Sequence, residues 1–95
     1  MWDNVEIIDH TWYCGRVGIV LARNIISDIQ CAYIGSYFTE GVDSDIREVL
    51  QHGSTLSIQQ AVAFFNGKVK PLKYLRCSDA LNHELYPEVA NASIE

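Results

Sequence analysis

The sequence lacks a long apolar run and is poor in basic residues, and each shortage excludes a class of function. No stretch approaches the roughly 20 apolar residues of a membrane-spanning helix, and Met1 is followed by Trp2 and Asp3 rather than by a basic and then apolar leader. We therefore expect a cytoplasmic protein with no membrane contact. Seven Lys and Arg against twelve Asp and Glu give a net charge of -5. Nucleic acid is disfavoured as a partner, because Lys and Arg supply most of the affinity for phosphates.

Cysteine and motifs with a known chemistry are also scarce. The three cysteines, Cys14, Cys31 and Cys77, have no CxxC spacing, so the sequence predicts reduced thiols rather than a disulfide framework or a zinc site. Patterns for phosphate loops, dinucleotide binding, serine hydrolases and zinc proteases are missing. The acids at 40–48 do not follow EF-hand spacing, and helix capping explains them. We expect no metal and no cofactor.

The residues that are present indicate one folded domain. Hydrophobic residues make up 48% and charged residues 20% of the 95 positions, a balance typical of globular proteins and unlike that of disordered chains. A chain of this length buries one core. We expect a single domain over residues 1–95, with its core at about 5–67 and a C-terminal extension at 68–95.

Three strands are predicted in the first part of the chain. The segment VEIIDHTWY at 5–13 mixes β-branched and aromatic residues, and two further apolar strands are predicted at 17–23 and 29–38. Residues 24–28 supply turn chemistry between the second and third strands. The three strands therefore form an antiparallel meander.

Both faces of this meander are apolar, whereas a half-solvated sheet alternates apolar and polar residues. If Ala22 lies opposite Gln30, the two faces consist of Val17, Ile19, Leu21, Cys31, Tyr33 and Gly35, and of Gly18, Val20, Ala22, Ala32 and Ile34. A slip of one residue changes the members of each face but leaves both apolar. Each face therefore needs a covering layer.

Two helices are predicted after the strands. The first, at about 43–52, begins at a capping Asp43 or Ser44 and ends before Gly53 in a left-handed conformation. The second begins with a capping box formed by Ser57 and Gln60. Its apolar stripe consists of Ile58, Ala61, Val62 and Phe65.

These elements predict an α+β fold, in which a three- to four-stranded antiparallel sheet carries both helices on one face. Pro71 and Pro87 interrupt the last third of the chain, so we expect the other face to stay uncovered. A homo-oligomer, most simply a two-fold dimer, would cover it. Phe64 lies a quarter turn from the apolar stripe of its helix, so it needs the first helix or another chain as a neighbour. The predicted interface residues are Val20, Ala32, Ile34 and Phe64.

Two further groups of side chains are candidate binding sites. Trp12, Tyr33 and Tyr37 predict an aromatic pocket at the junction of sheet and helices or of subunits. A basic cluster near the C-terminus predicts either an anion site or an edge that pairs with the acidic remainder of the protein. Its members are Lys68, Lys70, Lys73 and Arg76.

The strand at 5–13 offers one pair of residues for catalysis. His10 and Cys14 provide a base and a thiol, but Asp9 and His10 point to opposite faces of a strand, so Asp9 cannot orient the imidazole unless a bulge intervenes. We therefore assign no catalytic residues.

Several short stretches carry a resemblance to a known group of proteins: TWY at 11–13, GIVLA at 18–22, CAYIG at 31–35, and DSDI at 43–46 in a helix that ends at a glycine. They resemble small orphan proteins encoded in bacterial integron gene cassettes, over about residues 5–65. The resemblance implies a compact α+β protein that acts as an accessory or binding module. It carries over no functional residues, and the sequence departs from it at Ile25, Ile26 and after Gly67.

The functional expectation is a small non-enzymatic interaction module that self-associates through one sheet face. A small-molecule or anion-binding protein with an aromatic-lined pocket is the alternative. An enzyme that uses His10 or Cys14 is a third reading.

Overall fold

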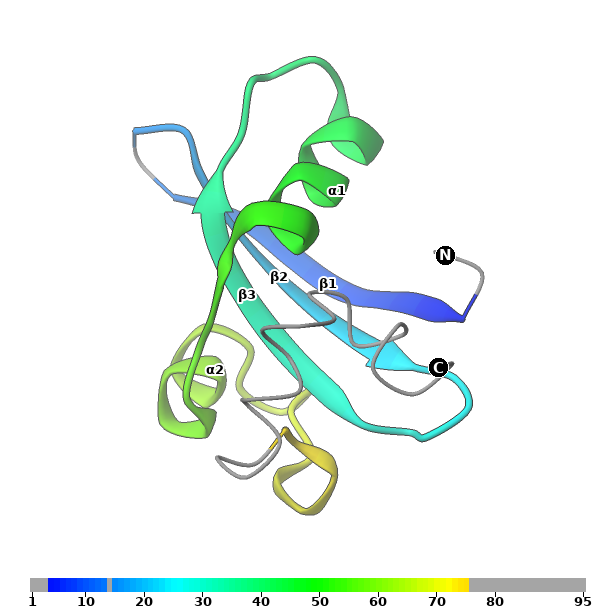
Figure 1. Ribbon diagram of the computed structural model, residues 1–95. Helices are drawn as coiled ribbons and strands as arrows, with labels where there is room; N and C mark the ends of the chain where they lie inside the picture. Colours follow the sequence, from blue (N-terminus) through cyan, green and yellow to red (C-terminus); the bar gives the residue numbers. More distant parts are fainter. Residues whose placement is uncertain (1–3, 14, 76–95) are drawn as a thin grey trace.

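The protein is an α+β structure built on one antiparallel sheet (Figure 1). The computed structural model describes residues 4–13 and 15–75. The elements, in chain order, are β1 (Val5–Tyr13), β2 (Val17–Asn24), β3 (Gln30–Ser36), α1 (Val42–His52), β4 (Ser54–Thr55), α2 (Ile58–Phe64) and the 3-10 helix η1 (Pro71–Lys73). Neighbouring strands in the order β1-β2-β3-β4 are antiparallel, so the predicted fold class and meander are confirmed.

The turn between β2 and β3 forms as its residue types predict. The side-chain Oδ1 of Asn24 accepts hydrogen bonds from the backbone N–H groups of Ile26 and Ser27, both at 2.8 Å. Asp28 adopts the left-handed conformation with φ 63°, which Asp tolerates better than most residues. The side chain of Asn24 therefore fixes the path of the turn.

The register of β2 and β3 differs by one residue from the predicted one. Ala22 lies opposite Cys31 rather than Gln30. Because side chains alternate between faces, this shift places Ile19 and Leu21 with Ala32, and Val20 and Ala22 with Cys31 and Tyr33. Both faces remain apolar, as expected.

The face of β2 and β3 that carries Val20, Ala22, Cys31 and Tyr33 is covered by α1. Three buried side chains of the helix, Ile46, Val49 and Leu50, complete this cluster. Four of these seven residues come from strands of the meander, so the first helix docks across the centre of the sheet.

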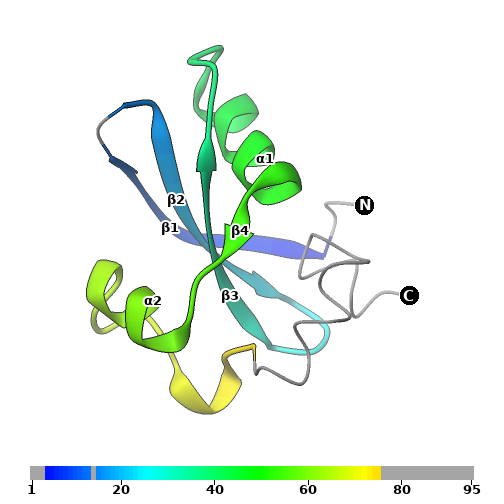
Figure 2. The same cartoon turned by 60° about the vertical axis from the view of Figure 1, so that its left-hand side comes forward.

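The opposite face is covered by α2 and the segment that follows it. Ile19, Leu21 and Ala32 of the sheet share a second buried cluster with Leu56, Ala61, Phe65 and Tyr74. The two helices therefore lie on opposite faces, which corrects the prediction that both cover one face. Figure 2 shows α1 and α2 on either side of β3, with β4 between them. The short strand β4 pairs with β3 at the edge of the sheet, and the chain changes faces there.

Both faces of β2 and β3 are thus covered by the chain itself, and this corrects the predicted interface. Val20 and Ala32 are fully buried beneath the two helical layers, so neither has surface available for a second chain. Ile34 is half-buried and packs against the α2 cluster. Phe64 is partly exposed, and its ring contacts Tyr13 of β1 rather than the first helix.

The helix ends agree with the sequence at α2 and differ at α1. In α2 the Ser57 hydroxyl accepts from the Gln60 N–H at 3.2 Å, while the Ser57 N–H donates to Gln60 Oε1 at 3.0 Å, which confirms the capping box. Helix α1 begins after Gly41 without a side-chain cap, so the predicted caps at its start are wrong. Gly53 is extended, with φ -80°, rather than left-handed. It is glycine because a Cβ would overlap carbonyl oxygens of α1 and β3.

Candidate functional site

Aromatic side chains gather at the end of the sheet where β1 connects to β2. On the α1 face, Trp12 packs on Tyr37 with ring centroids 4.7 Å apart and on His10 at 5.1 Å. The Trp12 ring fits because its cross-strand partner is Gly18, where a Cβ would lie 2.6 Å from the ring. Tyr33 is on the same face but is fully buried beneath α1. The predicted ligand-binding set is therefore split, and only Trp12 and Tyr37 meet at the surface.

A second aromatic pair lies on the opposite face of the same end. Tyr13 of β1 and Phe64 of α2 make an edge-to-face contact with centroids 6.1 Å apart. Phe38, just after β3, is largely exposed. We call the following residues the aromatic end: Trp12, Tyr13, Tyr37, Phe38 and Phe64. Alternation along β1 places Trp12 and Tyr13 on opposite faces of the sheet. The contact between Tyr13 and Phe64 depends on which face α2 covers, and the predicted placement of both helices on one face was wrong.

The aromatic end adjoins the free edge of the sheet. Within residues 4–13 and 15–75, no strand pairs with the outer edge of β1, which is the terminal strand in the sheet order. The pairing of β1 with β2 shifts between Ile7 and Asp9, which marks a bulge at Ile8. Beyond the bulge the strand continues regularly to Tyr13. The regular part of the free edge is therefore flanked by aromatic side chains on both faces.

The predicted anion-binding lysines are largely engaged with carboxylates of the sheet. Lys68 Nζ lies 2.8 Å from Asp9 Oδ2, and this hydrogen-bonded ion pair lowers the pKa of Asp9. Lys73 Nζ lies 4.0 Å from Asp28 Oδ2. Lys70 is exposed, and Arg76 lies outside the described residues. The arrangement favours the predicted pairing of a basic edge with the acidic remainder over a preformed anion site.

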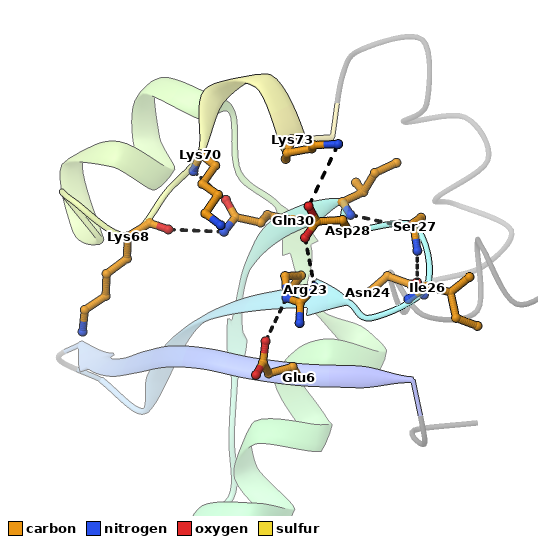
Figure 3. Close-up of polar contacts among 11 residues, drawn as sticks. Glu6, Arg23, Asn24, Ile26, Ser27, Asp28, Gln30, Lys68, Lys70 and Lys73 are labelled. Carbon is orange, nitrogen blue, oxygen red and sulfur yellow. Dashed lines mark hydrogen bonds and ion pairs between the residues drawn. The ribbon is translucent and has the colours of Figure 1, made fainter.

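Arg23 extends this arrangement across the sheet (Figure 3). Its guanidinium bonds to Glu6 Oε1 at 2.8 Å and to Asp28 Oδ1 at 2.9 Å, and these two carboxylates raise the pKa of Arg23. Glu6, Arg23, Asp28 and Lys73 thus form a row of alternating charges. The row connects β1 and β2 with the turn at Asp28 and with η1.

Buried Gln30 fixes the backbone of the basic segment. Its Nε2 donates to the Lys68 carbonyl at 3.2 Å, and its Oε1 accepts from the Lys70 N–H at 2.7 Å. The backbone carbonyl of Gln30 accepts from the Leu75 N–H at 2.9 Å. Figure 3 shows the Gln30 side chain between Lys68 and Lys70. The segment 68–75 is therefore part of the fold, although the sequence placed it in an extension.

The structure describes one of the two catalytic candidates, His10, and one of the three cysteines, Cys31. Burial raises the pKa of the Cys31 thiol to about 12, which keeps it protonated at neutral pH. His10 and Asp9 lie on opposite faces of β1, as predicted, because they oppose Val20 and Leu21 respectively. Cys14 and Cys77 lie outside the described residues. In residues 4–13 and 15–75 no group of three His, Cys, Asp or Glu side chains is placed to hold a metal ion.

A cleft of about 290 Å³ lies between β1 and α1, and none of the predicted site residues lines it. Its apolar lining is Val5, Ile7, Ile46 and Leu50, and the charged residues Asp43 and Arg47 of α1 complete it. The sequence does show the apolar residues at the start of β1 and the apolar stripe of α1 that line this cleft. Their contact could not be predicted, because the sequence did not show how α1 lies on the sheet.

Comparison with known proteins finds no match to this chain among family models, curated proteins or solved structures. Within the described part of the chain, no helix has the length and apolar character required to cross a membrane. The chemistry of the aromatic end, the free edge and the cleft therefore carries the functional argument.

Proposed function

We propose that the protein is a non-enzymatic interaction module that self-associates along the free edge of β1, with the aromatic ends of two copies in contact. We place the association at a sheet edge rather than at the sheet face expected from the sequence, because both faces of β2 and β3 are covered within the chain. The observation that carries the proposal is the exposed aromatic surface that flanks an unpaired edge within the described residues.

The geometry of β1 favours a strand as the partner. An edge strand presents backbone N–H and C=O groups that can extend the ladder, and neighbouring side chains on both faces then contact the added strand. Trp12 offers such a contact on the α1 face and Tyr13 on the α2 face. The bulge at Ile8 ends the regular edge, so pairing is expected over 10–13. Two copies of this short edge can pair antiparallel around a two-fold axis.

The exposed area is of the size that a dimer needs. Trp12, Tyr13, Phe38 and Phe64 are 38%, 55%, 61% and 39% exposed, which at about 200 Å² per aromatic side chain leaves about 400 Å² uncovered. A standard interface buries about 800 Å² per partner, of which about 60% is apolar. Four aromatic side chains therefore supply most of the apolar area that one partner contributes.

The test is the solution mass, measured by light scattering over a hundredfold range of concentration. We expect the wild-type protein to approach twice its monomer mass of 10.7 kDa at the upper end. Tyr13→Lys places a charge on the aromatic end, and we expect it to weaken the dimer at least tenfold. The matched control is Leu72→Lys, on exposed η1 beyond β3, which should leave the dimer unchanged. A wild-type monomer throughout, or equal dimerisation of Tyr13→Lys and wild type, would contradict the proposal.

The resemblance to integron cassette proteins remains a prediction from the sequence, and the proposal does not depend on it. The proposal also differs from the alternative of an aromatic ligand pocket, because Tyr33 is buried away from the other two residues of that set.

A further inference from the structure

The outer edge of β1 presents the backbone groups of alternate residues. In an antiparallel ladder, the N–H and C=O groups of successive residues point to opposite sides of the strand. The His10 N–H donates to Asp9 Oδ1 at 2.8 Å, so it points to the outer edge rather than to β2. Alternation directs the backbone groups of Trp12 to the same edge. His10 and Trp12 therefore carry the backbone groups that a second strand can bind.

The hydrogen bonds of β2 support this assignment. The Asn24 N–H donates to the Ile29 carbonyl at 2.9 Å, which is the side of β2 that faces β3. Ile19 is an odd number of residues away, so its backbone groups point to the other side, towards β1. There Ile19 lies opposite Thr11. Thr11 therefore bonds to β2, and its two neighbours face outward.

Two-fold symmetry limits the registers in which two β1 edges can pair. A two-fold axis that makes the two edges antiparallel runs perpendicular to the sheet, and directly opposite side chains then lie on the same face. The axis must pass through a residue, because an axis midway between two residues would bring together side chains of opposite faces. The regular part of β1 runs from Asp9 to Tyr13, and its middle residue is Thr11.

An axis at Thr11 uses all the outward backbone groups of this regular part. His10 of each copy then lies opposite Trp12 of the other, and each of these two pairs exchanges N–H···O=C bonds. An axis at His10 or Trp12 would pair that residue with its own copy. The next outward residue would then meet the bulge at Ile8, or residue 14 beyond the end of the strand. The register about Thr11 therefore forms the most backbone hydrogen bonds.

We infer that two copies pair about an axis at Thr11, an inference that rests on the proposed self-association and specifies its register. On the α1 face, the rings of His10 and Trp12 become cross-strand neighbours, and on the α2 face the two Thr11 side chains meet. Aromatic pairs and Thr–Thr pairs are both favourable across strands. The His10 N–H exchanges Asp9 Oδ1 for the Trp12 carbonyl of the second copy, while Asp9 keeps its ion pair with Lys68. The two Asp9 carboxylates stay about 13 Å apart along the ladder.

The first test is an intermolecular disulfide at position 11. In this register the two Cα atoms form a non-hydrogen-bonded pair about 4.5 Å apart, within the range of about 4.4 to 6.8 Å that disulfides require. Thr11→Cys, with Cys14→Ser and Cys77→Ser, should cross-link under mild oxidation at least tenfold faster than the control; Cys31 is fully buried and is retained. Ser54→Cys in the same background is the control, because Ser54 is exposed on β4 at the other end of the strand order. Equal rates for the two variants would overturn the inference.

Mixed cross-linking tests the position of the axis. An axis at Trp12 would place Thr11 opposite Tyr13 of the second copy, and the two Thr11 Cα atoms would lie on a diagonal about 7 to 8 Å apart. We expect Thr11→Cys chains to cross-link with one another at least tenfold faster than with Tyr13→Cys chains, as read out by peptide mass spectrometry. Cross-linking chiefly between Thr11→Cys and Tyr13→Cys would move the axis and overturn the inference.

Light scattering on the wild-type protein separates failure of the register from failure of the proposed self-association. A wild-type dimer together with a fast cross-link at position 11 is the expected result. A wild-type dimer without this cross-link would overturn the register alone, and a wild-type monomer at every concentration would overturn both.

Discussion

At the scale of single residues, the buried hydroxyl of Tyr74 makes two hydrogen bonds at the β3–β4 edge. Its hydroxyl accepts from the Ala32 N–H at 2.9 Å and donates to the Leu56 carbonyl at 2.7 Å. The Leu56 N–H in turn donates to the Ala32 carbonyl at 2.8 Å. The phenol therefore continues the ladder at the β3–β4 edge, where the strand β4 is too short to do so. Burial raises the pKa of Tyr74 well above its usual range.

Replacing Tyr74 by Phe should destabilise the protein by about 2 kcal/mol, because a buried N–H and a buried carbonyl both lose their partner. The free energy of unfolding in urea measures the effect. Tyr13→Phe is the control, since this exposed hydroxyl lies at the surface. A loss for Tyr74→Phe no larger than that of the control would show that water or a shifted backbone replaces the hydroxyl.

The sequence predicted some of the side chains that hydrogen-bond to the backbone and not others, for a physical reason. Asn24, Ser57 and Gln60 act on backbone groups within three residues, so their types and spacing were sufficient. Tyr74 and Ala32 are 42 residues apart, and only the folded arrangement brings them together.

At the scale of elements, the sequence predicted the strands and helices but not the side of the sheet on which each helix lies. The deciding element is β4, which has two residues and no recognisable pattern of its own. It pairs with β3 and carries the chain from the α1 face to the α2 face. Because the sequence did not reveal this crossing, it predicted an open sheet face. The predicted interface at Val20 and Ala32 depended on that open face.

The ion pair of Asp9 and Lys68 joins β1 to the segment after α2, and it gives stability a pH dependence. The folded-state pKa of Asp9 lies below its ordinary value of 3.8, so the contribution is present above about that pH and is lost as the pH falls through the folded-state pKa. At pH 7 we expect Asp9→Asn to lower the free energy of unfolding by about 0.5 kcal/mol, because the pair is partly solvated.

The difference between wild type and Asp9→Asn should shrink below pH 3.8, as the wild-type carboxylate becomes protonated. Urea unfolding at pH 7 and at pH 3 measures it, with the exposed Glu40→Gln as the control. A difference that stays constant over this range would show that Asp9 acts by packing rather than by charge.

At the scale of the whole molecule, two layers cover both faces of β2 and β3, and the outer edge of β1 is where we propose that a partner binds. The faces are buried beneath α1 on one side and α2 with Tyr74 on the other. Aromatic side chains flank the regular part of the remaining edge, on both faces. The proposed association at this edge would extend the sheet without displacing either helix.

Hydrogen exchange at low and high protein concentration tests this account most directly, because it separates an edge contact from a face contact. We predict that exchange at 10–13 slows as the concentration rises, while β2 and β3 stay protected at both concentrations, since their faces are covered within each chain. Exchange at 10–13 that does not depend on concentration, or slowing confined to β2 and β3, would contradict it.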